Sequence, residues 1–168
     1  MKPLIEKLYG MLISAGNAAQ PAFLLLVRLY WGWQFVQTGW GIVTNLPKVI
    51  GFFTDLGIPA PAVNAVFVSG LELVGGALLI VGLASRPIAL LMTGNMLVAY
   101  ITADREALGS IFSDPGKFYG ATPYTFLFAA LLVLIFGPGR YSLDAILGPK
   151  LRSTPIPDAA QQRRAYAS

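Results

Sequence analysis

The sequence predicts an all-α fold, an integral membrane four-helix bundle with interfacial helices before the first span and between the first and second spans. Only 12% of the 168 residues are charged, and the mean hydropathy is +0.64, whereas soluble domains carry about 25% charged residues. Four apolar stretches alternate with short polar connections. We therefore expect one transmembrane domain over residues 1–148, followed by a disordered cytoplasmic tail at 149–168 that is polar and contains several prolines.

Residues 1–20 place apolar side chains at helical spacing opposite charged ones, which predicts a helix lying in the membrane interface. A cleavable signal peptide is the alternative, but Glu6 and Lys7 interrupt the apolar run that it requires. The first span follows at residues 21–40 and is unusually polar for a membrane segment.

The segment between the first two spans contains a short apolar stripe with Pro47 in its first turn. At about ten residues it is too short to cross a bilayer, so we expect a second interfacial helix, ended by the Gly/Pro-rich run 57–61. The remaining spans are predicted at residues 62–83, 87–103 and 119–137. The turn before the third span is so short that spans two and three must be antiparallel neighbours, whereas residues 102–122 form a charged aqueous loop.

The orientation follows from the basic residues. Eight lysines and arginines fall on the side that holds both termini, and three fall on the other side. The positive-inside rule then places both termini in the cytoplasm. Because the basic residues flank apolar spans and form no stripe, we expect the lipid bilayer and no nucleic acid as partner.

The chain contains no cysteine and no histidine. This excludes thiolate nucleophiles, iron–sulfur ligation and histidine-ligated metal sites within the chain. We therefore expect no catalytic residue, no metal site and no covalently bound cofactor, and no catalysis by the chain alone.

An ionised carboxylate within a span is costly, so Glu72 in the second span calls for a partner. Helix geometry puts Arg28 and Asn95 at similar depths, which predicts an intramembrane polar cluster of these three residues, with Gln34 and Trp31 beside it. One interpretation is a structural Arg28–Glu72 pair that fixes the helix register. The other is a polar pocket that binds a ligand or relays a proton. The two interpretations are compatible.

Small residues favour close helix packing in membranes. Gly32 and Gly39 share a face of the first span with Arg28. The packing glycines of the second span are Gly75, Gly76 and Gly82. We expect the two glycine faces to meet and so to bring Glu72 to Arg28.

Three stretches then carry a family resemblance: Arg28-x3-Gly32-x2-Phe35-x3-Gly39; the run 56–61 followed by Glu72-x2-Gly75-Gly76-x5-Gly82-Leu83-x2-Arg86; and Gly137-Pro138-Gly139-x-Tyr141-Ser142-Leu143-Asp144. In order and spacing, over residues 20–145, they resemble the DoxX family of small bacterial and archaeal membrane proteins. The resemblance implies a four-helix membrane bundle in the cytoplasmic (inner) membrane of a bacterium or archaeon. It also implies an association with quinone-linked or oxidative-stress redox complexes, through an archaeal quinol oxidase or thiosulfate:quinone oxidoreductase subunit and a mycobacterial complex containing superoxide dismutase and a sulfurtransferase.

Two positions depart from the pattern that the resemblance implies. Thr38 and Ile42 stand where family members often have histidine and lysine, so a role resting on those side chains is not expected here. Three functions remain: a non-catalytic accessory subunit of a quinone-linked or oxidative-stress redox complex, with a quinone or quinol as ligand; a small-solute permease or channel; and a scaffold without chemistry of its own. The expected protein partners are redox-complex subunits or further copies of this chain.

Overall fold

A computed structural model describes residues 2–152, with side chains described for residues 4–148. Within this part of the chain every regular element is a helix, so the all-α prediction is confirmed. Two of the helices, α1 and α3, are long and apolar enough to cross a membrane, and α7 is a shorter apolar helix. The predicted tail at 149–168 lies outside the described residues apart from the end of α8.

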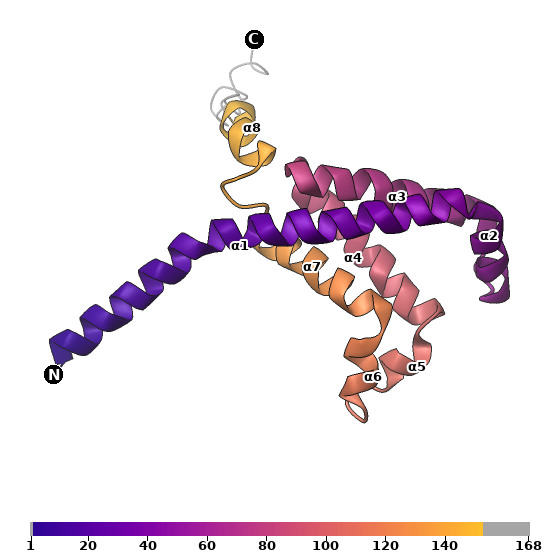
Figure 1. Cartoon of the computed structure of the whole chain (residues 1–168), viewed down its shortest axis with the longest axis horizontal. Helices are drawn as coiled ribbons and strands as arrows, with labels where there is room; N and C mark the ends of the chain where they lie inside the picture. The colour runs from indigo at the N-terminus through magenta and orange to yellow at the C-terminus, as the bar shows by residue number, and fades with distance from the viewer. Residues whose placement is uncertain (1, 153–168) are drawn as a thin grey trace, which may run out of the picture.

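Helix α1 (Lys2–Thr44) joins the predicted interfacial helix and the predicted first span into one continuous helix of 43 residues with Pro21 inside it. Figure 1 shows its N-terminal part extending away from the other helices and changing direction before it reaches them. A proline within a helix removes one hydrogen bond and favours such a bend. The segment is helical as predicted, while its position in the membrane interface stays a prediction.

Helix α2 (Leu46–Asp55) is the short helix predicted between the first two spans, with Pro47 in its first turn. None of its residues is buried. It ends at a turn in which Gly57 adopts φ 70°, a left-handed conformation that glycine enters without the steric cost of a Cβ atom.

Helices α3 (Pro61–Val81), α4 (Ser85–Thr102) and α7 (Thr122–Phe136) pack with α1 so that α1 contacts α3, α3 contacts α4, α4 contacts α7 and α7 contacts α1. The turn between α3 and α4 is as short as expected. The predicted loop after α4 also contains two short helices, α5 (Arg105–Gly109) and α6 (Pro115–Gly120). Figure 1 places α8 (Leu143–Arg152) at the end of the bundle away from α5 and α6. We call these the α8 end and the α2 end, because α2 lies on the same side as α5 and α6.

The glycines define the contact between α1 and α3. A Cβ atom on Gly32 would lie 2.9 Å from the Gly76 carbonyl oxygen, and one on Gly39 would lie 2.5 Å from the Leu73 backbone nitrogen. The two backbones therefore touch without side chains between them, as small residues permit. Gly75 faces α4 instead, where its Cβ would lie 2.7 Å from Met92 Cε.

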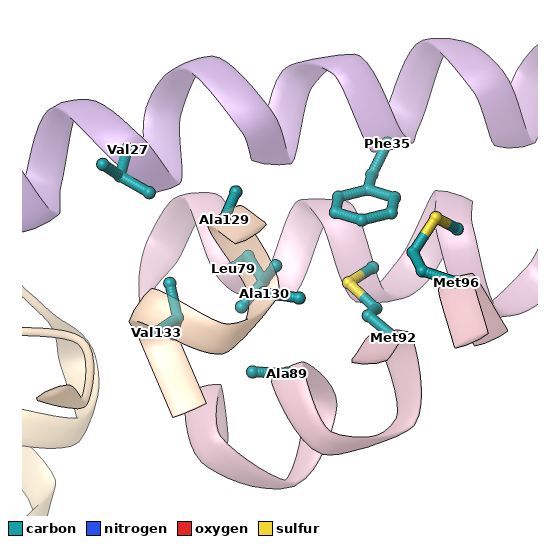
Figure 2. Close-up of a cluster of buried hydrophobic side chains, with 9 residues drawn as sticks. All are labelled: Val27, Phe35, Leu79, Ala89, Met92, Met96, Ala129, Ala130 and Val133. Atoms are coloured by element: carbon teal, nitrogen blue, oxygen red, sulfur yellow. The ribbon is translucent and has the colours of Figure 1, made fainter. Parts of the chain in front are cut away.

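The apolar core lies where α1, α3, α4 and α7 meet (Figure 2). Phe35, Met92 and Ala130 are 0% exposed. Figure 2 shows the Phe35 ring reaching from α1 towards the other helices. The remaining members of the cluster are Val27, Leu79, Ala89, Met96, Ala129 and Val133.

Candidate functional site

Two polar centres lie at different levels of the bundle. The first, at the α8 end, is built on Arg28, which is only 1% exposed. Its Nη2 donates a hydrogen bond to the Tyr141 carbonyl oxygen. Its guanidinium also packs against Gly82, where any Cβ atom would collide with it. Gly82 closes α3 with φ 72°, so it supplies both the turn and the room for Arg28.

Asp144 completes this centre by capping α4. Its two carboxylate oxygens accept hydrogen bonds from the Ala84 and Ser85 backbone N–H groups, each at 2.8 Å. Its own backbone N–H donates to the Gly82 carbonyl oxygen at 2.9 Å. The first N–H groups of a helix have no partner within the helix, and Ala84, the local N-cap residue, supplies no side-chain cap. Asp144 thus ties the start of α8 to the α3–α4 turn.

The pKa of Asp144 reflects this environment. Burial alone would raise it, but the hydrogen bonds from Ser85 and Ala84 and the nearby Arg28 guanidinium outweigh burial and lower the pKa below its ordinary value. The carboxylate is therefore ionised at neutral pH, as a charged cap requires. We refer to Arg28, Gly82, Ala84, Ser85, Tyr141 and Asp144 as the Arg28–Asp144 cluster.

The predicted Arg28–Glu72 pair does not form. Arg28 lies beside Gly82, and Glu72 lies ten residues earlier in α3, which is about 15 Å along the helix axis. Neither side chain can span that distance. The sequence-based depths placed both residues near one level, but α1 and α3 run so that Arg28 faces the very end of α3.

Glu72 instead forms the second polar centre, nearer the α2 end. Only 6% of it is exposed, and its Oε1 accepts a hydrogen bond from Asn95 Nδ2 at 3.0 Å. Thr38 lies beside the same carboxylate. Of the predicted cluster, the structure therefore brings together Glu72 and Asn95 and places Arg28 elsewhere.

Glu72 lines two adjoining cavities, with volumes of about 200 Å³ and 330 Å³. The first lies between α2, α3 and α4 and is also lined by Asn95; the second reaches α1 and α7 and is also lined by Thr38. Both have mainly apolar walls. The residues that line both are Phe52, Glu72, Met96, Ala99 and Ala103. We call the two cavities together the Glu72 pocket.

Trp31 and Gln34 are not among the residues that line the Glu72 pocket. Trp31 packs edge-on against Phe126, with ring centroids 5.5 Å apart, at the margin of the apolar core. Gln34 is half-buried on α1. No group of three or more acidic, histidine or cysteine residues suited to a metal ion occurs among the described residues.

The match to a family model decides the relationship: the DoxX model covers residues 23–105. The chain belongs to the DoxX family. It is 27% identical to the inner membrane protein YphA of Escherichia coli K12 over 135 residues, 76% of this chain and 92% of the relative. It is 28% identical to the uncharacterized membrane protein Rv3486 of Mycobacterium tuberculosis over 152 residues, 80% of this chain and 86% of the relative. No solved structure matches it.

These relatives and the apolar helices identify an integral membrane protein of the DoxX family. The DoxX match covers Arg28, Glu72 and Gly82, while Asp144 and Tyr141 come from the stretch after α7. Asp144 belongs to the third stretch of the family resemblance, but no role was predicted for it. The signal that could have found it is a helix start at Ala84–Ser85 with no local cap.

Thr38 and Phe52 were also missed as lining residues. The location of Thr38 could have been predicted, because it precedes Gly39. Gly39 faces Leu73 on α3, and Leu73 is the neighbour of Glu72. Phe52 could not be assigned to the pocket from the sequence. It lies on α2, and nothing in the sequence shows against which of the other helices α2 packs.

Proposed function

We propose that this DoxX-family protein binds a quinol in the Glu72 pocket and serves a quinone-linked membrane redox complex as a non-catalytic subunit. The observation that carries the proposal is a buried carboxylate with spare hydrogen-bonding capacity facing an apolar cavity. An ionised carboxylate has about four acceptor positions, and Asn95 occupies one of those on Glu72.

A quinol head group suits this arrangement chemically. Its hydroxyl groups donate hydrogen bonds, which Glu72 can accept, and its ring is apolar like the walls formed by Phe52 and Met96. Ligand pockets are typically about 300–1,000 Å³, mostly apolar, with a few polar groups that fix orientation. One cavity, of about 200 Å³, lies below that range and the other, of about 330 Å³, lies at its small end, which suits a single ring better than a large solute.

The accessory role rests on composition. A chain without cysteine or histidine lacks the usual ligands for a redox metal, so electrons from a bound quinol must pass to a partner subunit. The proposal includes four spans, formed by α1, α3, α4 and α7, with both termini in the cytoplasm. Counted over the whole sequence, eight lysines and arginines fall on the side of both termini, whereas Lys48, Arg105 and Lys117 fall on the side of α2, α5 and α6, which supports this orientation.

The first test is binding by the purified full-length protein in lipid nanodiscs. A short-chain ubiquinol should raise the Tm in a concentration-dependent manner, because a ligand that binds only the folded state stabilises it. Glu72→Leu removes every acceptor oxygen and should abolish the shift. Glu6→Leu, the same substitution at an exposed carboxylate of α1 that does not line the pocket, should leave it intact.

The second test addresses the complex. Quinol-oxidising activity from membranes of the native host should migrate with the tagged protein on a native gel, and it should be lost with Glu72→Leu while the protein level is unchanged. An equal Tm shift of wild type and Glu72→Leu on addition of ubiquinol would refute the assignment of the binding site to the Glu72 pocket. Activity that migrates independently of the protein refutes the accessory role.

A further inference from the structure

The Glu72 pocket continues to the surface at the α2 end. A third cavity, of about 390 Å³, shares Ala103 and Asp104 with the larger half of the Glu72 pocket. It is also lined by Glu106 and Lys117. The three cavities therefore adjoin one another, from Glu72 past Ala99 and Ala103 on α4 to Asp104. We call this series of cavities the passage.

The mouth of this passage lies among charged side chains. Glu106 and Lys117 form an ion pair there, with side chains 84% and 40% exposed. Asp104 lies directly before α5. Ionised groups are stable where water solvates them and costly in hydrocarbon, so this end of the passage faces an aqueous phase.

In the other direction the bundle is tightly packed. On the side of Glu72 towards the α8 end lie the fully buried side chains of Phe35, Met92 and Ala130. Beyond them, Arg28 and Asp144 close the α8 end. A passage that is open at one end and closed at the other connects Glu72 with one compartment only.

We propose that Glu72 exchanges protons with the aqueous phase at the α2 end through this passage, and that ligand occupancy of the Glu72 pocket therefore depends on the pH of that one compartment. This deepens the proposed quinol site and rests on it for the identity of the ligand. In the exchange, hydronium gives one proton to a Glu72 carboxylate oxygen and leaves water. The ionised form accepts a hydrogen bond from a ligand hydroxyl, whereas the protonated oxygen donates one instead.

The groups around Glu72 make this titration simple. Thr38 from α1, Asn95 from α4, and Thr122 and Phe126 from α7 are uncharged. Helix α2 contributes the apolar Phe52 and Phe53. Among the residues that line the pocket, Asp104 is the other titratable one, and it lies at the mouth, where it can pass protons between water and the passage.

The access can be tested with single thiols, because the chain contains no cysteine. Ala99 lines the passage, Leu97 lies two residues away at an exposed position of α4, and Phe112, before α6, is 94% exposed. Each is replaced by cysteine in a separate variant. In proteoliposomes, a charged, membrane-impermeant thiosulfonate should label Ala99→Cys and Phe112→Cys from the same side and leave Leu97→Cys unlabelled. Labelling of Ala99→Cys from the α8 side, or equal labelling of Leu97→Cys, overturns the passage.

The protonation itself can be followed by infrared spectroscopy of the full-length protein. A protonated carboxyl band that titrates reversibly should be present in the wild type and absent in Glu72→Gln, and Asp104→Asn should slow its exchange with D₂O. A Glu72 band that does not respond to pH, or an exchange rate unaltered by Asp104→Asn, overturns the proposal. Neither experiment uses a quinol, so failure of the proposed ligand leaves these outcomes readable.

Discussion

Gly76 offers the sharpest test of the helix packing. Replacing it with alanine adds a Cβ atom 2.6 Å from the Gly32 carbonyl oxygen and 2.9 Å from the Val36 backbone nitrogen. Both neighbours are backbone atoms of α1, so no change of rotamer can make room. Ordinary contact begins near 3.4 Å, so α1 and α3 must separate by about 0.8 Å along their closest line.

The expected magnitude is the difference between two effects. Alanine improves helix propensity over glycine by about 1 kcal/mol, whereas overpacking a tight contact costs about 1–3 kcal/mol. Gly70 lies on the same helix and has nothing within 4 Å of its Cβ position, so Gly70→Ala receives the propensity gain alone. The packing cost is therefore the stability difference between the two variants, about 1–3 kcal/mol.

The assay is thermal unfolding followed by the intrinsic fluorescence of the three tryptophans. At about 2–4 °C per kcal/mol for a chain of this size, Gly76→Ala should unfold about 2–12 °C below Gly70→Ala in the same detergent. Equal Tm values for the two variants would refute the close approach of α1 and α3 and the register built on it.

Two further predictions concern the polar centres. Asp144→Asn keeps one acceptor oxygen of the cap but loses the second and the charge near Arg28, so stability should fall by about 0.5–2 kcal/mol at neutral pH. Because the pKa of Asp144 is lowered in the folded state, the ionised carboxylate stabilises the fold at neutral pH, and this stabilisation is lost as the pH falls through the folded-state pKa. The Tm difference between wild type and Asp144→Asn should therefore shrink below about pH 4. A Tm difference that stays constant with pH would contradict the charged cap. Arg28→Met and Glu72→Leu should be additive within about 0.5 kcal/mol, since residues more than about 7–10 Å apart without shared partners do not couple. A double variant more stable than additivity predicts would instead indicate an Arg28–Glu72 ion pair, which the structure lacks.

Much of the fold could be predicted from the sequence because apolar length and helix-breaking residues are local signals. The apolar run after Pro61 ends near Gly82 and predicts α3 closely, and Pro47 marks the start of α2. The continuity of α1 was missed because the polar residues before Pro21 resemble a boundary. In the structure they continue the same helix.

The Arg28–Glu72 pair was wrong for a reason that sequence alone could not reveal. Depth estimated from predicted span ends carries an error of several residues, and each residue shifts a side chain by about 1.5 Å along the helix. The register is fixed instead by contacts such as Gly39 against Leu73. The partner of Arg28, the Tyr141 carbonyl, lies in a loop whose path depends on the complete bundle.

Residues that match the DoxX pattern lie at both polar centres, whereas the two departures lie at one of them. Arg28, Gly82 and Asp144 match and build the α8 end, where Asp144 caps α4 and Gly82 leaves room for the Arg28 guanidinium. The buried Nε and Nη1 atoms of Arg28 have no hydrogen-bond partner among the described residues. Thr38 and Ile42, where the resemblance implies histidine and lysine, both line the Glu72 pocket. Thr38 and Ile42 lie four residues apart on α1 and therefore share a helix face. A ligand site on that face can differ among relatives while the scaffold around it stays the same. With two ionisable side chains replaced by uncharged ones, this pocket is more apolar than the pattern implies, and Glu72 is left as its principal charge.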